Sequence, residues 1–467
     1  MKRLSVNEQL NLIEFAVRKK HHLSDVLKER GLSYDSLVYS DGVCRFNRQV
    51  PDFVPVDERS RKPNGIKCVS FFSGAGGLDI GFKCAGFENI IDVELNDMFG
   101  NTLKANGAKD VIIGDMNDYP SVIKELEQRG IRKNFPGVFH GGPPCQSFSV
   151  AANQRFSKGM EKFKRTGFNN KSLGNLLFCY IEVIRHFTPE TFLIENVDGL
   201  LTIDNGEQVT RACKLLRDVG YDVTPPRIVN AADYGVPQKR MRTFIVGSRI
   251  GHFVFPNPSP QFPAGSVFKR TYAGLQNHVS REHSSESITR YMKLAFGERD
   301  KLGRVDRIDP YKPSKTIIAG GMKGGGRSPL HPFIPRTMTV RECARIQTFP
   351  DSYIFTGPIA RQFTQVGNAV PPVLAYEMAC AIYDSIYARS KGPSEILPLM
   401  HQNEMQEEPD FKATGTDNVM PSYEQMALFE KEANFRMPRN CRNKSSLTSK
   451  KATASKPKTK NPDRGQS

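Results

Sequence analysis

The stretch IKCVSFFSGAGGLDIGF, residues 66–82, decides the fold. Its first seven residues form an apolar run typical of a short buried strand. The glycine-rich segment Ser73–Gly77 then leads into a helix that begins near Leu78. A strand, a glycine turn and a helix in this order open a doubly wound α/β domain, and the glycines let a ligand approach the backbone closely. The sequence therefore predicts an α/β fold with a ligand site at the end of this strand.

Two further strands in the predicted sheet end in acidic residues. The run 90–94 ends at Glu94, about twenty residues after the glycine turn, where an acid commonly binds ribose hydroxyls. The run 111–115 ends at Asp115, which is also suited to capping a following helix. A dinucleotide-binding enzyme is the natural competitor, but its fingerprint needs a third glycine three residues after Gly76, and Asp79 stands there.

A rigid loop follows the next predicted strand. Residues 136–140 read PGVFH, and residues 141–149 read GGPPCQSFS. The glycines and prolines hold the backbone out of regular structure, so the Cys145 side chain is aimed rather than free. A thiol on a stiff loop at a strand end indicates a nucleophile. On spacing alone, a buried structural cysteine remains an alternative.

Two more segments carry charged residues at strand ends. The apolar run 192–194 leads into Glu195, which should lie partly desolvated and therefore have a raised pKa. In the extended segment 236–247, Gln238, Arg240 and Arg242 alternate and should point to one face. Taken alone, these three residues fit a charged ladder on an edge strand equally well.

Together these segments resemble the DNA (cytosine-5) methyltransferases of the bacterial restriction-modification type. The similarity covers residues 66–387 and includes the motif blocks in the family's order. The blocks are Phe-x-Gly-x-Gly at 72–76, Pro-Cys at 144–145, Glu-Asn-Val at 195–197, Gln-x-Arg-x-Arg at 238–242 and Gly-Asn-x-Val-Pro at 367–371. The resemblance implies a Rossmann-like, S-adenosylmethionine-dependent methyltransferase domain with a smaller target-recognition domain. One departure is Asn96, where the family often has an acid.

The resemblance also implies a chemistry. Cys145 would add to carbon 6 of a cytosine flipped out of the duplex, so that carbon 5 attacks the methyl group of the cofactor. Glu195 would stabilise protonation at ring nitrogen 3, and Arg242, with Arg240 beside it, would hold the ring oxygen. The residues expected to bind S-adenosylmethionine are Phe72, Gly74, Gly76, Gly77, Glu94, Asp115, Met116, Pro144, Asn368 and Val370.

Double-stranded DNA is the expected substrate. The basic segment 154–171 would contact phosphates, although a solvated loop is the alternative. We expect residues 251–365 to form the target-recognition domain, with the motif-free stretch 252–330 determining the sequence read. The residues predicted to contact DNA are Gln146, Ser149, Arg155, Lys162, Arg165, Gln238, Lys323 and Arg327.

The flanks of the chain differ from its centre. Residues 1–65 form a leader with short helices predicted over 7–19 and 24–30, the second capped by Ser24, followed by a linker. The basic residues 18–22 are compatible with two interpretations of the leader: a small element that contacts DNA, or a solvated appendage. Residues 66–250, completed by 366–390, form the catalytic domain. A capped helix is expected from Thr339, with Cys343 in the core, and a last helix should carry Leu374, Met378, Ile382 and Ile386 on one face. The basic, low-complexity tail 391–467 is predicted to be disordered.

The composition of the chain limits the possible partners and functional classes of the protein. A net charge of +17 favours a polyanionic partner. The nine cysteines are scattered singly, which argues against zinc and disulfides, and neither a membrane span nor a signal peptide is seen, so we expect a cytoplasmic monomer without a bound metal. A cognate restriction endonuclease acting on the same site is a further expected partner. A transfer-RNA methyltransferase is disfavoured because its Cys-Phe-Thr tripeptide is absent, and an inactive DNA-binding module because Cys145, Glu195 and Arg242 are intact.

Overall fold

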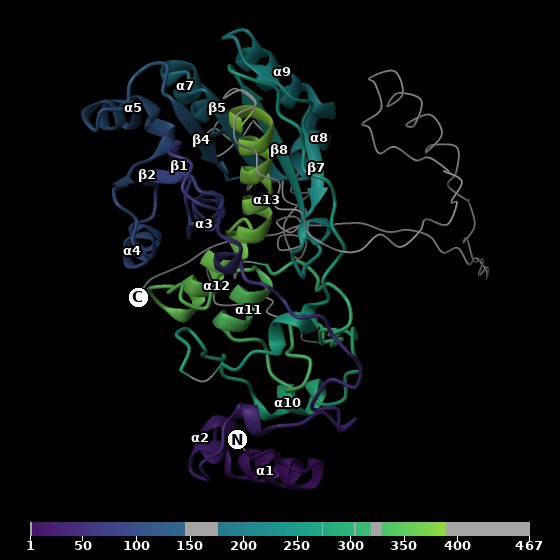
Figure 1. Cartoon of the computed structure of the whole chain (residues 1–467). Helices are drawn as coiled ribbons and strands as arrows, with labels where there is room; N and C mark the ends of the chain where they lie inside the picture. Colours follow the sequence, from purple (N-terminus) through teal and green to yellow (C-terminus); the bar gives the residue numbers. More distant parts are fainter. Residues whose placement is uncertain (1, 145–175, 273, 303–304, 319–328, 389–467) are drawn as a thin grey trace, which may run out of the picture. The chain divides into compact units, whose positions relative to one another are not determined.

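The strand predicted from the opening stretch, β1 (Lys67–Phe71), lies inside a mixed sheet (Figure 1). The computed structural model describes residues 2–144, 176–272, 274–302, 305–318 and 329–388, all within one compact unit. The sheet order is β3-β2-β1-β4-β5-β8-β6, and β7 also pairs with β8. This order confirms the doubly wound α/β fold.

Parallel strands make up one part of the sheet and antiparallel strands the other. The parallel strands are β1, β2 (Glu88–Glu94), β3 (Val111–Ile113), β4 (Gly137–Gly141) and β5 (Thr191–Val197). Strand β8 (Met241–Ser248) runs antiparallel to β5, and the short strands β6 (Asp222–Val223) and β7 (Arg227–Asn230) pair antiparallel to β8.

Helices cover both faces of the sheet, because successive strand residues point to opposite sides. In β5, Phe192 and Ile194 pack with α5 (Tyr119–Gln128), α7 (Leu176–Phe187) and α9 (Glu207–Arg217). Leu193 packs on the opposite face with α3 (Gly77–Cys84) and α13 (Pro372–Ile382). The short α8 (Gly199–Thr202) follows β5, and α4 (Asp97–Ala105) packs beside β3.

The last helix brings the far end of the chain back to the first helix after β1. The predicted residues Leu374, Met378, Ile382 and Ile386 are buried, the last in a π-helical turn, Tyr383–Tyr387. Packing of α3 against α13 is so close that a side-chain carbon on Gly81 would collide with Ala375. The prediction that this helix packs on the sheet is therefore confirmed.

The residues between β8 and α13 contain few regular elements. They include α10 (Ser285–Tyr291), α11 (Val340–Ile346) and α12 (Ile359–Asn368), joined by irregular segments. Helix α11 begins with the predicted capping box of Thr339 and Glu342, and Cys343 is fully buried in the core. Among the described helices, none is long and apolar enough to cross a membrane.

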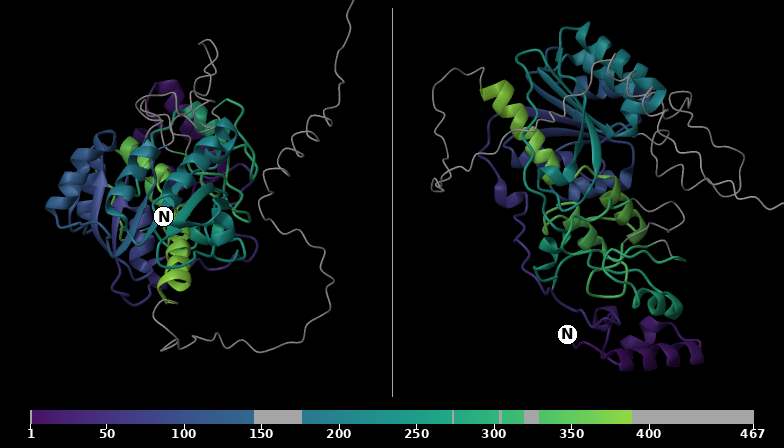
Figure 2. Two further views of the ribbon diagram at one scale, coloured as in Figure 1. Left: turned by 90° about the horizontal axis from the view of Figure 1, so that it is seen from above. Right: turned by 90° about the vertical axis from the view of Figure 1, so that its right-hand side faces the viewer.

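The leader begins with two helices, α1 (Val6–Lys19) and α2 (Leu23–Lys28), which lie beside α10 (Figures 1 and 2). The cap predicted for α2 is wrong: His22 rather than Ser24 precedes it, because Leu23 already belongs to the helix and is buried. The solvated-appendage interpretation is also wrong, since leader residues share a hydrophobic core with α10.

Candidate active site

The carboxyl ends of four parallel strands meet along one edge of the sheet. Phe71 of β1 pairs with Val93 of β2 and with Gly141 of β4, and Gly141 pairs in turn with Ile194 of β5. The next residues along these strands are Phe72, Glu94, Gly142 and Glu195. Three motifs that lie far apart in the sequence are therefore brought to one edge, where ligands of open α/β sheets bind.

The glycine turn after β1 is tied to the end of β2. The backbone N–H of Gly74 donates to Glu94 Oε2 at 2.8 Å, and the N–H of Asn96 donates to Oε1 at 2.9 Å. Burial raises the pKa of Glu94, although these backbone hydrogen bonds oppose the shift. Phe72 has a φ of 52°, a left-handed conformation that costs a non-glycine residue about 1–3 kcal/mol and often marks a functional site.

The glycines of this turn have different surroundings. A side-chain carbon on Gly77 would collide with the Val370 carbonyl, and one on Gly76 would lie 2.8 Å from the Tyr353 hydroxyl. At Gly74 the nearest atom would be the Phe72 carbonyl oxygen, at 3.8 Å. Open space for a ligand therefore lies at Gly74, while Gly77 allows the turn to pack against the chain's far end.

Glu195 and Arg242 form an ion pair at the end of β5. Arg242 Nε lies 2.7 Å from Glu195 Oε1, and both side chains are only slightly exposed, 13% for Arg242 and 11% for Glu195. Burial raises the pKa of Glu195, although the Arg242 charge opposes the shift; the predicted raised pKa is thus confirmed. A side-chain carbon on Gly142 would lie 2.8 Å from Glu195 Oε2, so the loop that leads to Cys145 passes directly over this carboxylate.

Asn196 holds the same loop through a hydrogen bond to its backbone. Its buried side-chain amide donates to the Pro143 carbonyl at 3.3 Å, and its Oδ1 accepts the N–H of Val197 at 2.8 Å. Pro144 is exposed. Cys145 and the predicted DNA contacts Gln146, Ser149, Arg155, Lys162, Arg165, Lys323 and Arg327 lie outside the described residues and stay predictions.

Arg240 is fully buried rather than directed toward a substrate. Its guanidinium donates to the carbonyls of Ile317 at 3.2 Å, Gly367 at 2.9 Å and Ala369 at 3.0 Å. These contacts join the Ile317 backbone to the last turn of α12 and to Ala369, which follows it. The placement contradicts the prediction that Arg240 acts on the base and gives it a positioning function.

Gln238 belongs to the same buried network. Its Nε2 donates to Gln347 Oε1 at 2.6 Å, and its Oε1 accepts the N–H of Ile317 at 2.8 Å. Gln347 in turn donates to the carbonyls of Val366 at 2.7 Å and Ala369 at 3.1 Å. Gln238 has no exposed surface, which contradicts the prediction that it contacts DNA.

The other predicted cofactor residues have mixed surroundings. Asp115 is exposed and caps the short helix that follows it, accepting the N–H of Asn117 at 2.9 Å. Met116 is buried against the sheet. Asn368 is exposed at the end of α12, and Val370 is buried against the turn at Gly77.

A buried polar cluster beneath the glycine turn was not predicted. Asp79 Oδ1 lies 3.9 Å from His140 Nδ1, and Asn89 donates to Asp92 at 2.6 Å. Burial lowers the pKa of His140 to about 3 and raises that of Asp92 to about 6; the pKa of Asp79 is also raised. The signal in the sequence was a polar residue within each apolar strand, β2 and β4.

Thr348 was also missed as a positioning residue. It has a φ of 69°, which is unusual for a β-branched side chain, and its Oγ1 accepts the N–H of Val373 at 3.0 Å near the start of α13. Its signal is visible only when α11 and α13 are seen together.

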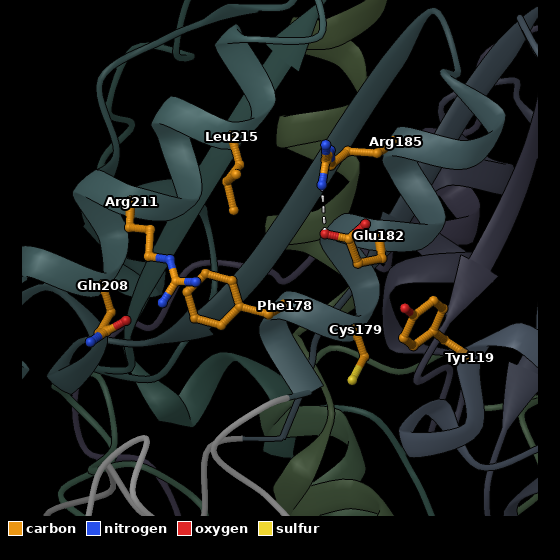
Figure 3. Close-up of a pocket in the computed structure, with 8 residues that line it drawn as sticks. All are labelled: Tyr119, Phe178, Cys179, Glu182, Arg185, Gln208, Arg211 and Leu215. Atoms are coloured by element: carbon orange, nitrogen blue, oxygen red, sulfur yellow. Dashed lines mark hydrogen bonds and ion pairs between the residues drawn. The ribbon is translucent and has the colours of Figure 1, made fainter.

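A hollow of about 520 Å³ lies between helices rather than at the strand ends, and Figure 3 shows the residues that line it. Arg211 lies over the ring of Phe178 at 5.0 Å within it. No predicted site residue lines it. A second hollow of about 630 Å³ begins directly after Glu94 and is lined by Leu95, Asn96, Asp97, Met98, Asn101, Thr356 and Gly357. Among the described residues, no His, Cys, Asp or Glu group is arranged to hold a metal ion.

Comparison with known proteins agrees with this geometry. Residues 66–384 match the family model of the C-5 cytosine-specific DNA methylases. The type II methyltransferase M1.HphI of Haemophilus parahaemolyticus is 32% identical over 67% of this chain and 86% of its own length. M.MthTI of Methanothermobacter thermautotrophicus is 35% identical over 67% of this chain and 95% of its own length.

Solved structures show the same fold. A putative DNA modification methyltransferase encoded within a prophage of E. coli superposes with a TM-score of 0.56 at 24% identity, covering 69% of this chain and 99% of its own. The sheet, its edge and these matches define a methyltransferase of the α/β class. The chain belongs to the C-5 cytosine-specific DNA methylase family and is a DNA (cytosine-5) methyltransferase.

Proposed function

We propose that this enzyme methylates carbon 5 of a cytosine within a specific double-stranded DNA sequence, using S-adenosylmethionine, a flipped-out base and a covalent bond to Cys145. One observation carries the proposal. The Glu195–Arg242 pair lies against Gly142, three residues before Cys145, so a base bound by the pair is within reach of the loop that bears the thiol.

Cys145, Glu195 and Arg242 are proposed to have different roles in the reaction of the cytosine ring. Carbon 5 of cytosine is a poor nucleophile, and addition of the Cys145 thiolate at carbon 6 makes it an enamine-like carbon. Glu195, whose pKa is raised by burial, holds a proton at ring nitrogen 3, while Arg242 donates to the ring oxygen. Once carbon 5 has gained the methyl group, loss of its proton to water and departure of the Cys145 thiolate restore the aromatic ring. A stacked cytosine cannot reach these groups, so the nucleotide is flipped out at a cost of a few kcal/mol.

The strand edge fits S-adenosylmethionine, which supplies the methyl group when bound. Gly74 leaves open space beside the turn, and Glu94 presents a carboxylate whose remaining lone pairs suit ribose hydroxyls. Phe72 is held in a strained conformation at the same edge. The hollow after Glu94 adjoins this edge, and Asp115 and Met116, which follow the neighbouring strand β3, remain proposed ligands. Asn368 and Pro144 are exposed and remain candidates for contact, whereas Gly77 and Val370 support the turn.

Sequence specificity is proposed to lie in residues 252–330, within the target-recognition domain 251–365. The residues at the strand edge are proposed to bind the flipped-out cytosine and the cofactor. The neighbouring bases must therefore be contacted by another part of the chain. Lys323 and Arg327 are proposed base or phosphate contacts there, and residues 154–171 are proposed phosphate contacts. Arg240 and Gln347 are proposed to hold the loop at 366–369 in place for both ligands.

The relatives are named type II methyltransferases, and we extend that setting to this chain as a proposal. In it, the enzyme works as a cytoplasmic monomer and protects DNA from a cognate restriction endonuclease that cuts the same sequence. Methylated sites mapped by sequencing converted DNA from an expressing host would identify that sequence.

The covalent step is tested with Cys145→Ser. DNA that carries 5-fluorocytosine at the target should trap the wild-type enzyme in a bond stable to denaturation, because the proton to be removed is replaced. Cys145→Ser should bind the same duplex but transfer no methyl and form no adduct. The matched control is Cys44→Ser, which changes an exposed free cysteine and should leave trapping intact. An adduct that persists in Cys145→Ser sinks the assignment.

A further inference from the structure

The leader is anchored by the same part of the chain that we propose reads DNA. Leu12, Ile13 and Val26 share one hydrophobic core with Ile288 of α10 and with Leu330. The leader precedes the segment matched by the family, residues 66–384, so its function does not follow from family membership.

Two acidic residues of the leader, Asp35 and Asp41, bind buried arginines from the later part of the chain. Asp35 pairs with Arg336 at 2.7 Å and Asp41 with Arg307 at 2.5 Å; both arginines are almost completely buried. Arg307 also lies 3.5 Å from the ring centre of Tyr39. Two further acids in the following linker make exposed pairs: Asp52 with Lys269, and Glu58 with Arg270.

Basic residues of the leader face outward. The five consecutive residues Arg18, Lys19, Lys20, His21 and His22 are all exposed at the junction of α1 and α2. Within the described part of the chain, no acidic side chain pairs with Arg18, Lys19 or Lys20. The exposed acidic residues of the two helices and their caps, Glu8, Glu14, Asp25 and Glu29, lie outside these five positions, so the junction presents an unbroken run of basic side chains to solvent.

We propose that this α1–α2 junction binds the phosphate backbone of duplex DNA outside the methylated sequence. The helices on either side of the junction share a core with α10 and share no core residue with the sheet, so the junction is separate from the strand edge where the target base is proposed to bind. Clustered basic side chains that have no acidic partner bind the DNA phosphates and release their counterions. This binding does not depend on the nucleotide sequence. The partner is thus the same duplex, held at its flank.

Helix polarity alone does not account for these charges. The basic side chains of Arg18 and Lys19 in the last turn of α1 stabilise the negative end of the helix dipole, and this effect falls off within that turn. Lys20 stands at the cap with a φ of 55°, where asparagine or glycine would be favoured. The left-handed cap therefore carries a charged residue where helix stability alone favours glycine or asparagine.

The test compares two duplexes that carry the target sequence, one of about four helical turns and one of about one turn. The variant Arg18→Gln, Lys19→Gln, Lys20→Asn removes three charges while placing a tolerated residue at the left-handed cap. On the long duplex, the slope of log affinity against log salt should fall by up to about 0.9 for each phosphate that the variant no longer neutralises. On the short duplex, affinity and kcat should match the wild type.

The matched control removes three other exposed lysines, Lys83, Lys104 and Lys124, which lie on α3, α4 and α5. It should retain the wild-type salt slope on both duplexes, which separates position from net charge. The single variant Lys20→Asn supplies a milder change if the triple variant melts early. An unchanged slope on the long duplex, or an equal reduction on both duplexes, overturns the proposal. Failure of the proposed function would show differently, as absent methyl transfer by the wild type on the short duplex.

Discussion

Two arginine–glutamate pairs in this chain look alike and differ in how completely their atoms are used. Arg336 binds Glu342 through two bonds of 2.8 Å, and its remaining donors go to Asp35 and to the Thr337 carbonyl. Arg242 touches Glu195 through Nε and its own backbone neighbour, the Met241 carbonyl, through Nη1. Both Arg336 and Glu342 are 1% exposed, whereas Arg242 and Glu195 retain a little exposure.

The difference indicates how an ion pair that only stabilises the fold can be distinguished from one that is available to bind a substrate. A saturated, enclosed pair has no capacity left for a ligand, so its value lies in holding segments together. A pair with free lone pairs and donors at a sheet edge is available to a substrate. The residue types are the same in both pairs, so the remaining exposure and the unused donors and lone pairs decide the interpretation.

The largest effect is expected at the working pair. Glu195→Gln should lower the rate of methyl transfer about 10²–10⁴-fold, because a neutral amide cannot hold the proton at ring nitrogen 3. Folding stability should fall by less than about 3–5 kcal/mol, the cost typical of a fully buried pair, because both side chains keep some exposure and Arg242 also donates to the Met241 carbonyl. Single-turnover assays and urea unfolding measure the two quantities. A large decrease in stability with unchanged chemistry would reverse the comparison.

The saturated pair should show the opposite pattern. Glu342→Gln leaves the charge of Arg336 buried with Asp35 alone, and should destabilise folding by about 3–5 kcal/mol. Although burial alone would raise it, the Arg336 charge lowers the pKa of Glu342 to about 2, in line with a strongly held carboxylate. The control is Glu125→Gln, which breaks an exposed helical pair with Arg129 and should cost less than about 0.5 kcal/mol. Equal costs for the two variants would show that enclosure does not matter here.

The same contrast exists within the glycine turn. Gly77→Ala places a carbon against the Val370 carbonyl and should cost about 1–3 kcal/mol in stability through overpacking. Gly74→Ala enters open space and meets only the strain of a φ of 59°, roughly 1 kcal/mol. Cofactor affinity should instead fall more for Gly74→Ala, as measured by calorimetry. If both substitutions affect affinity and stability equally, the turn is not divided as we describe.

The sequence predicted those parts of the fold and site that depend on local pattern. The strands ending at Phe71, Glu94 and Val197 follow from apolar runs and their end residues, and so does the capping box of α11. Burial of Gln238 was not predictable, because Gln347, which accepts its hydrogen bond, lies 109 residues away in the chain.

Long-range packing explains the other misses. The many charged residues of the leader favoured the interpretation that it is a solvated appendage. Its apolar residues instead pack against α10, which lies far along the sequence. The contact between Asp79 and His140 depends on how α3 lies over β4, which no local spacing encodes. Such contacts appear only once register and helix docking are known.

The smallest expected effect concerns a buried carboxylate that lacks an arginine. Asp92 is 3% exposed and accepts from Asn89, with the titratable groups Asp79 and Asp110 nearby and His140 neutral across the sheet. Burial raises its pKa in the folded state to about 6, above its value of about 3.9 in the unfolded chain.

Protonation of Asp92 therefore stabilises the folded state below about pH 3.9, and this contribution disappears as pH rises through about 6. Asp92→Asn should be more stable relative to the wild type at pH 8 than at pH 5, by about 1 kcal/mol in urea unfolding. The control Asp218→Asn, at an exposed carboxylate paired with Lys214, should show no such difference. A relative stability that is the same at both pH values would mean that Asp92 ionises normally, and that a buried carboxylate needs no arginine partner in this sheet.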